Sequence, residues 1–165
     1  PDAEVHGIEL GAALLRYGHA RAESMGKAVH FSQQNAEATN FEDGSFDLVI
    51  SCIIFHETSR KALPRIIAET RRLLKTDGIM VHLEAGQFEN LDLWRQVVFD
   101  AETYNNNEPF WSTYRDMNLE DVIAEAGWPK KSTHMHMEPF RHNPETSASK
   151  AQRNVMGFWF MVGQK

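Results

Sequence analysis

The chain has 165 residues, enough for one domain with a sizeable core, and apolar and charged residues make up 42% and 24% of it. The 17 Lys and Arg residues against 23 Asp and Glu give a net charge of −6, which does not favour a nucleic-acid-binding surface. No apolar run approaches the ~20 residues of a membrane-spanning helix. The one cysteine, Cys52, excludes an intrachain disulfide and is compatible with a reducing compartment, so a cytoplasmic location is expected.

The first half of the chain is predicted to alternate between strand and helix. Strands need alternating or unbroken apolar runs, and helices need apolar residues three and four positions apart. In chain order, these patterns predict a strand at 4–10, a helix at 12–25, strands at 29–33 and 46–55, a helix at 63–74 and a strand at 79–84. Thr58 or Ser59 could cap the second helix, and Asp77-Gly78 is a turn before the last strand. This rhythm indicates βαβ units and a parallel sheet.

The end of the chain follows a different pattern. A helix is predicted at 118–126, stopped by Gly127, and then two strands, 132–138 and 155–163, follow with only a polar loop between them. Two consecutive strands most simply form an antiparallel pair. His134 and His136 alternate on the first of these strands and so share a face, but two imidazoles alone make no metal site, and we expect none.

Three short motifs fall where predicted strands end. Gly7-Ile8-Glu9-Leu10 closes the first strand, Asn35-Ala36-Glu37 follows the second, and Ser51-Cys52 lies at the end of the unbroken apolar run that begins at Phe46. In open α/β sheets, ligands bind at the carboxyl ends of the strands. Together with the parallel sheet and terminal hairpin, these motifs resemble the class I S-adenosylmethionine-dependent methyltransferases. The resemblance runs from Val5 to Gly163 and implies a Rossmann-like α/β fold, with helices on both faces of the sheet.

The resemblance implies a cofactor site for S-adenosylmethionine. Glu9 would accept hydrogen bonds from the ribose hydroxyls, and Asn35 would face the adenine amino group while the backbone of Ala36 meets the ring. Leu10, Ser51 and Cys52 complete the expected cofactor-binding set, the last two near the methionine part. Glu9 could also be a solvated loop residue, or serve a dinucleotide as in oxidoreductases, and Asn35 could simply shape a turn.

His56 is the candidate catalytic residue. It follows the central strand at the expected mouth of the cleft, and its ordinary pKa near neutrality suits a general base that takes a proton from the acceptor. It is also a candidate to contact the substrate. The alternative is a pocket-lining histidine without a proton-transfer role, since orientation alone can suffice for methyl transfer.

Residues 86–115 are rich in aromatic side chains and lie where the family builds a cover over its acceptor site. Part of this segment has helical spacing and is expected to pack in the core. The rest would form an apolar lid that favours a small-molecule acceptor. Trp94, Tyr104 and Trp111 are its candidate substrate-binding residues.

Residues 1–165 are expected to form one methyltransferase-type domain that is incomplete at its N-terminus. Pro1 opens the chain almost directly on a strand, so the family's first strand and its glycine-rich loop would precede it. The predicted function is methyl transfer from S-adenosylmethionine to a small molecule by in-line displacement, with no membrane or nucleic-acid partner and with a homo-oligomer left open. The alternatives are a non-catalytic domain that keeps the fold, and another adenosine-cofactor enzyme such as a dinucleotide oxidoreductase.

Overall fold

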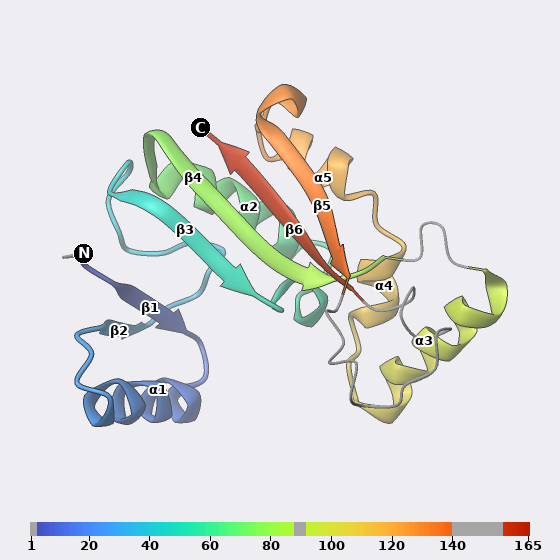
Figure 1. Cartoon of the computed structure of the whole chain (residues 1–165), viewed down its shortest axis with the longest axis horizontal. Helices are drawn as coiled ribbons and strands as arrows, with labels where there is room; N and C mark the ends of the chain where they lie inside the picture. Colours follow the sequence, from blue (N-terminus) through green and yellow to red (C-terminus); the bar gives the residue numbers. More distant parts are fainter. Residues whose placement is uncertain (1–2, 88–91, 140–156) are drawn as a thin grey trace. The chain divides into compact units, whose positions relative to one another are not determined.

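The computed structural model describes residues 3–87, 92–139 and 157–165, drawn in colour in Figure 1. These residues form two compact units, 1–41 and 42–165, and each is described by itself. Part of the expected substrate cover, residues 88–91, and the predicted polar loop at 141–153 lie outside the described residues. The expectation of one domain over the whole chain stays a prediction.

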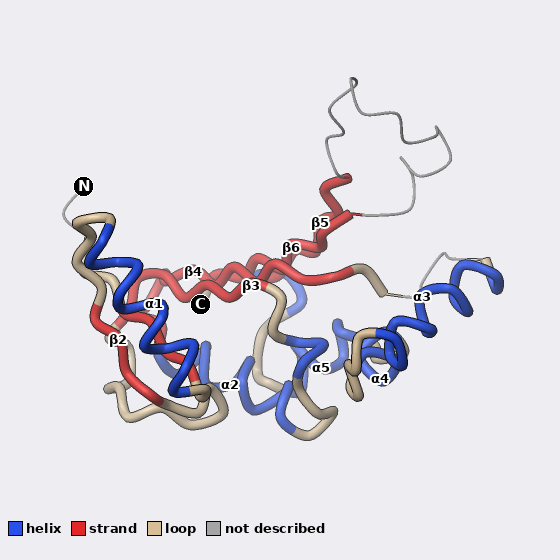
Figure 2. Tube along the Cα trace, turned by 90° about the horizontal axis from the view of Figure 1, so that it is seen from below, coloured by secondary structure: helices blue, strands red, loops and turns tan. Residues whose placement is uncertain are grey.

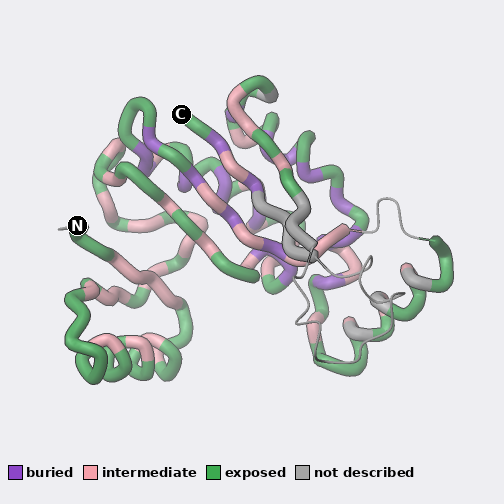
Figure 3. The backbone as a smooth tube through the Cα atoms, in the orientation of Figure 1, coloured by how far each residue is buried: buried purple, intermediate pink, exposed green. Residues whose placement is uncertain are grey.

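The N-terminal unit is a single βαβ motif. Strand β1 (His6–Glu9) and strand β2 (His30–Gln33) pair in parallel, with Glu9 opposite Gln33, and helix α1 (Ala12–Ser24) connects them. This confirms the three predicted elements. The chain leaves α1 through Gly26, whose φ of 62° is strained for residues with a side chain. None of residues 3–41 is fully buried, as the absence of purple in this unit in Figure 3 shows.

The C-terminal unit is built on a four-stranded sheet. Its strands are β3 (Phe46–Cys52), β4 (Leu74–Ala85), β5 (Thr133–Pro139) and β6 (Gly157–Gln164), in the spatial order β3-β4-β6-β5 (Figure 1). Strands β3 and β4 are parallel, whereas β6 is antiparallel to both of its neighbours. The predicted terminal hairpin is confirmed, and its second strand lies between the first and the parallel pair.

Helices α2 (Ala62–Leu73) and α5 (Leu119–Glu125) lie on the same side of this sheet (Figure 2). The Ser59 hydroxyl accepts the N–H of Ala62 and the Asn118 side chain accepts that of Asp121, so each helix starts at a polar cap. The largest fully buried side chains of this unit come from α2, from β4 and from the segments that pack beside them, and are Trp128, Tyr114, Phe55, Leu63, Ile67, Leu74, Met80 and His82.

Two predicted strand boundaries were wrong, and both errors bear on the site. Strand β3 ends at Cys52 rather than at residue 55, because Ile53 has a φ of 55° and the chain then enters a 3₁₀ turn, η1 (Phe55–Glu57). Strand β4 starts at Leu74, directly after α2. The predicted turn at Asp77-Gly78 is an irregularity inside this strand, where Asp77 has a φ of 65° and the register to β3 shifts.

The segment between β4 and α5 is helical. It contains α3 (Leu93–Asn105) and the short α4 (Trp111–Arg115), and a second 3₁₀ turn, η2 (Lys130–Ser132), precedes β5. Within the described ranges, every helix is too short or too polar to cross a bilayer.

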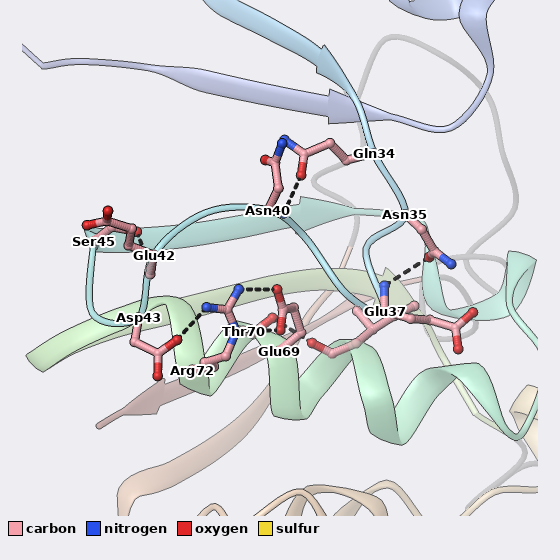
Figure 4. A network of polar contacts seen from close by, with 11 residues as sticks. Gln34, Asn35, Glu37, Asn40, Glu42, Asp43, Ser45, Glu69, Thr70 and Arg72 are labelled. Carbon is pink, nitrogen blue, oxygen red and sulfur yellow. Dashed lines mark hydrogen bonds and ion pairs between the residues drawn. The ribbon is translucent and has the colours of Figure 1, made fainter.

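Arg72 ties the end of α2 to the loop before β3 (Figure 4). Its guanidinium donates to Glu69 at 2.6 and 2.8 Å and to Asp43 at 2.5 Å, and its carbonyl oxygen accepts the N–H of Gly44. The hydrogen bonds that Arg72 donates to Glu69 and Asp43 raise its pKa, so this clamp stays charged at all ordinary pH values. It fixes the point at which the chain enters β3.

Candidate active site

In the N-terminal unit, the two predicted adenosine-binding side chains stand at the same edge of the strand pair. Glu9 ends β1, and Asn35 lies two residues beyond Gln33, which is the partner of Glu9 in β2. The Glu9 carboxylate accepts the N–H of Gly11 at 2.7 Å, and the Asn35 side-chain oxygen accepts the N–H of Glu37 at 2.9 Å (Figure 4). Leu10 is exposed and Ala36 half-buried.

These residues fit an adenosine in their chemistry. A carboxylate and a side-chain amide stand at the ends of neighbouring parallel strands, at the carboxyl edge where ligands bind, and their roles toward ribose and adenine stay predictions. The Asn35 oxygen also closes a turn, as the alternative reading predicted, but a carbonyl oxygen has a second lone pair for a ligand.

In the C-terminal unit, Ser51 and Cys52 occupy the carboxyl end of β3, as expected. The Ser51 hydroxyl lies 2.7 Å from Nδ1 of His82 on the adjacent strand, and the Cys52 thiol is exposed. His82 is almost completely buried, and burial lowers its pKa to about 4. His82 is therefore a neutral histidine at physiological pH that holds the Ser51 side chain in place.

The same strand edge carries a buried acid–histidine pair. Glu84, near the carboxyl end of β4, accepts a hydrogen bond from Nδ1 of His56 in η1, and both side chains are at most 4% exposed. The Glu84 carboxylate also accepts the backbone N–H groups of Phe55, at 2.6 Å, and Ala85, at 2.7 Å. All of these partners are N–H donors, so Glu84 is the acceptor in each bond.

This arrangement fixes the protonation pattern of the imidazole. Because Nδ1 donates to Glu84, the neutral form of His56 carries its lone pair on Nε2. Nε2 lies 3.8 Å from a carboxylate oxygen of Glu57, whose side chain is 55% exposed. The proton-accepting nitrogen therefore lies on the side of the exposed Glu57 carboxylate.

Two opposing effects act on the pKa of His56. Burial lowers it, but the hydrogen bond and the charge of Glu84, together with the charges of Glu57 and Glu108, outweigh burial and raise the pKa above its ordinary value of 6.5. His56 is thus a stronger base than a free histidine. The sequence placed it at the mouth of the cleft, whereas the structure shows it at 4% exposure under aromatic side chains.

Helix α4 supplies this aromatic cover. Trp111, 8% exposed, meets the His56 ring edge-to-face with 4.6 Å between centroids, and Tyr114 donates its hydroxyl to the carbonyl oxygen of Ala85 at 2.9 Å. The Gln87 amide donates to the carbonyl oxygens of Tyr114 and Met117. These bonds tie α4 to the end of β4 and make the cover part of the core.

Of the three predicted cover aromatics, the structure brings only Trp111 to His56. Trp94 and Tyr104 are 73% and 81% exposed on α3, and their roles as substrate-binding residues stay predictions. His134 and His136 are exposed on β5, and no group of metal-ligating side chains gathers within 3–87, 92–139 and 157–165.

Sequence reasoning missed Glu84 and Glu108. A signal for Glu84 was present, because a carboxylate at the end of an otherwise apolar, buried strand needs donors and marks the ligand-binding edge. No comparable signal marks Glu108, which precedes α4 and reaches the site only through the fold of residues 92–117.

Comparisons with known proteins find a family match in the N-terminal part of the chain. Residues 1–78 match a family model described as a methyltransferase domain. The chain is 28% identical, over 85 residues, to the highly reducing polyketide synthase azaB of Aspergillus niger. It is 32% identical, over 79 residues, to an uncharacterized protein of Haemophilus influenzae. These matches cover 49% and 47% of this chain, but only 3% and 32% of those curated relatives.

The fold of nearly the whole chain has a solved counterpart. The crystal structure of a SAM-dependent methyltransferase of Methanosarcina mazei superposes with a TM-score of 0.68 at 18% identity. The superposition covers 98% of this chain and 82% of that one. At this identity the match shows the fold alone, and the family model matches residues 1–78, which are less than half of the chain. The chain therefore has the fold of the SAM-dependent methyltransferases, and its first 78 residues resemble a methyltransferase domain.

Proposed function

We propose that this chain contributes the cofactor and acceptor sites of an enzyme that transfers a methyl group from S-adenosylmethionine to a small molecule. When bound, the cofactor supplies an electrophilic methyl on a sulfonium. The residues of the chain bind the cofactor and the acceptor, orient them, and accept the proton that the acceptor loses. Placing a nucleophile in line with that methyl provides most of the rate enhancement in such a reaction.

The observation that carries this proposal is the buried Glu84–His56 pair at the carboxyl end of the parallel strands. A carboxylate that fixes one imidazole nitrogen and leaves the other as a base is the arrangement that proton transfer requires. It stands at the edge where Ser51 and Cys52 lie, the residues predicted to flank the methionine part of the cofactor.

Glu9 and Asn35 would hold the adenosine part. Each is positioned by a backbone N–H group, that of Gly11 or of Glu37, so their side chains are oriented before a ligand arrives. Preorganised acceptors cost less entropy on binding than mobile ones.

Titration of the chain with S-adenosylhomocysteine by calorimetry tests the proposal. Saturable binding that S-adenosylmethionine competes away, and NAD does not, is expected. Absence of binding would contradict the proposal for this chain and favour a non-catalytic domain. Displacement by NAD would instead favour a dinucleotide enzyme.

A small-molecule acceptor is supported by the burial of the side chains beside His56. Trp111, Tyr114 and Arg115 of α4 are all at most 8% exposed, so this wall is built of packed side chains and excludes water. An enclosed, largely aromatic wall suits a small ligand better than an extended polymer.

A further inference from the structure

Acidic groups lie on both sides of the His56 ring, with Glu84 at Nδ1 and Glu57 3.8 Å from Nε2. Within the described ranges, the charged side chains that shift its pKa are Glu84, Glu57 and Glu108, and each of them raises it. The cation of the same wall, Arg115, stacks on Trp111, with its guanidinium carbon 5.3 Å from the ring centroid. A group delivered to Nε2 therefore enters a negative electrostatic field.

One carboxylate oxygen of Glu108 lacks a hydrogen-bond donor in the described part of the chain. Its Oε2 is buried and makes no hydrogen bond to any residue in the described part of the chain. Its backbone is fixed from both sides, because its N–H donates to Thr103 and its carbonyl oxygen accepts the N–H of Trp111. A buried carboxylate oxygen without a donor is unfavourable, and a ligand that brings an N–H group relieves that cost.

This field discriminates between acceptor groups. Methylation of an alcohol or phenol through its oxyanion would create a negative charge beside three carboxylates, which raises the barrier. Methylation of an amine moves the positive charge of the sulfonium onto nitrogen, where the same carboxylates stabilise it.

We propose that the methyl acceptor is an amine that arrives as its ammonium ion, with Glu57 and Glu108 accepting its N–H groups and Nε2 of neutral His56 taking one proton. The inference rests on the proposed function and names its substrate class. Glu57 lies 3.8 Å from Nε2, and Oε2 of Glu108, whose charge acts on the same imidazole, has no hydrogen-bond partner in the described part of the chain.

The step balances in atoms and charge. One N–H proton of the ammonium passes to Nε2, which leaves a neutral amine with its lone pair free and an imidazolium paired with Glu84. The amine lone pair forms the new C–N bond as the methyl–sulfur bond breaks, and that electron pair stays on sulfur. The products are the methylated ammonium ion and S-adenosylhomocysteine, and the proton later leaves His56 for solvent.

A binding experiment tests the inference without any turnover. Benzylamine and benzyl alcohol share one skeleton and differ only in the group that would face Nε2. We expect benzylamine to shift the ¹⁵N resonances of His56 saturably at pH 7, and benzyl alcohol to bind about tenfold more weakly or not at all.

Matched variants assign the effect to the acidic residues. Glu108→Gln should weaken benzylamine binding about tenfold, and Glu57→Gln, at an exposed position that should not affect folding, should weaken it severalfold. Glu125→Gln, an exposed glutamate at the end of α5, is the matched control and should leave binding unchanged.

Equal shifts by the alcohol, no shift by either probe, or unchanged amine binding in both Glu108→Gln and Glu57→Gln would overturn the inference. Failure of the proposed function has a different signature. It appears as no S-adenosylhomocysteine binding by calorimetry while benzylamine still perturbs His56.

Discussion

The carboxylate of Glu84 and Nδ1 of His56, 28 residues apart in the sequence, form a hydrogen bond at 3% and 4% side-chain exposure. One residue ends the second parallel strand of the sheet, and the other follows the first. A pair this deeply buried is costly to desolvate, and the additional N–H donors of Phe55 and Ala85 offset that cost. It orients a base on a rigid part of the fold.

Glu84→Gln should lower the pKa of His56 below 6.5. Burial of the imidazole opposes its charged form, and the variant removes the carboxylate that most strongly counteracts burial. The free energy of unfolding should fall by about 1–3 kcal/mol, because hydrogen bonds to a charged group are lost. Two-dimensional NMR titration of the imidazole and urea unfolding give the two quantities.

Glu57→Gln is the control for this experiment. Glu57 acts on the same imidazole from 3.8 Å but is 55% exposed, so its removal should lower the pKa of His56 less. A pKa of His56 that stays the same in Glu84→Gln would show that the pair does not form in solution.

The protein should lose stability between pH 6.5 and 4 because of His82. Its pKa is about 4 in the folded state against an ordinary value of 6.5, so unfolding takes up a proton throughout this range. The stabilising contribution is complete above pH 6.5 and falls by about 3 kcal/mol as the pH approaches 4. His56 has the opposite sign, since its contribution is complete below 6.5 and is lost as the pH rises through its raised pKa.

Urea unfolding at a series of pH values measures this loss. His82→Leu should flatten the dependence between pH 6.5 and 4, whereas His134→Leu, at an exposed position on β5, should not. If the free energy of unfolding falls equally with pH in the wild type and in His82→Leu, the loss of stability does not come from His82.

Gly163→Ala should destabilise the C-terminal unit by about 1–3 kcal/mol. A Cβ at this position in β6 would lie 2.6 Å from Cε of Met80 and 3.0 Å from Cζ3 of Trp128, so the core beneath the sheet would have to shift. Thermal unfolding followed by near-ultraviolet circular dichroism reports on the Trp128 environment. Gln164→Ala, at the exposed neighbouring position, serves as the control, and similar losses in both variants would contradict the packing argument.

Glu9→Ala should weaken S-adenosylhomocysteine binding by about 1–3 kcal/mol, the scale of hydrogen bonds lost to a charged group. Calorimetric titration measures it, and Glu23→Ala, on the exposed side of α1, is the matched control. Unchanged affinity in Glu9→Ala would remove the ribose assignment and leave Glu9 as a residue that only accepts the N–H of Gly11.

The sequence by itself determined the alternation of strand and helix, the antiparallel hairpin and the strand ends on which Glu9, Asn35 and Ser51 lie. These features follow from local periodicity and from the rule that ligands bind at the carboxyl edge of a parallel sheet. The sequence also pointed to His56, because a histidine directly after a buried strand is placed at that edge.

Only the tertiary structure decided which groups surround His56. Glu84 and Glu108 are 28 and 52 positions beyond His56 in the chain, and pairing of β4 with β3 and the packing of α4 bring their charges to one imidazole. Residue spacing cannot predict such contacts, because strand register and helix packing are set by the core as a whole. For the same reason Trp111 is buried beside His56 while Trp94 is exposed, although both lie in the same predicted cover segment.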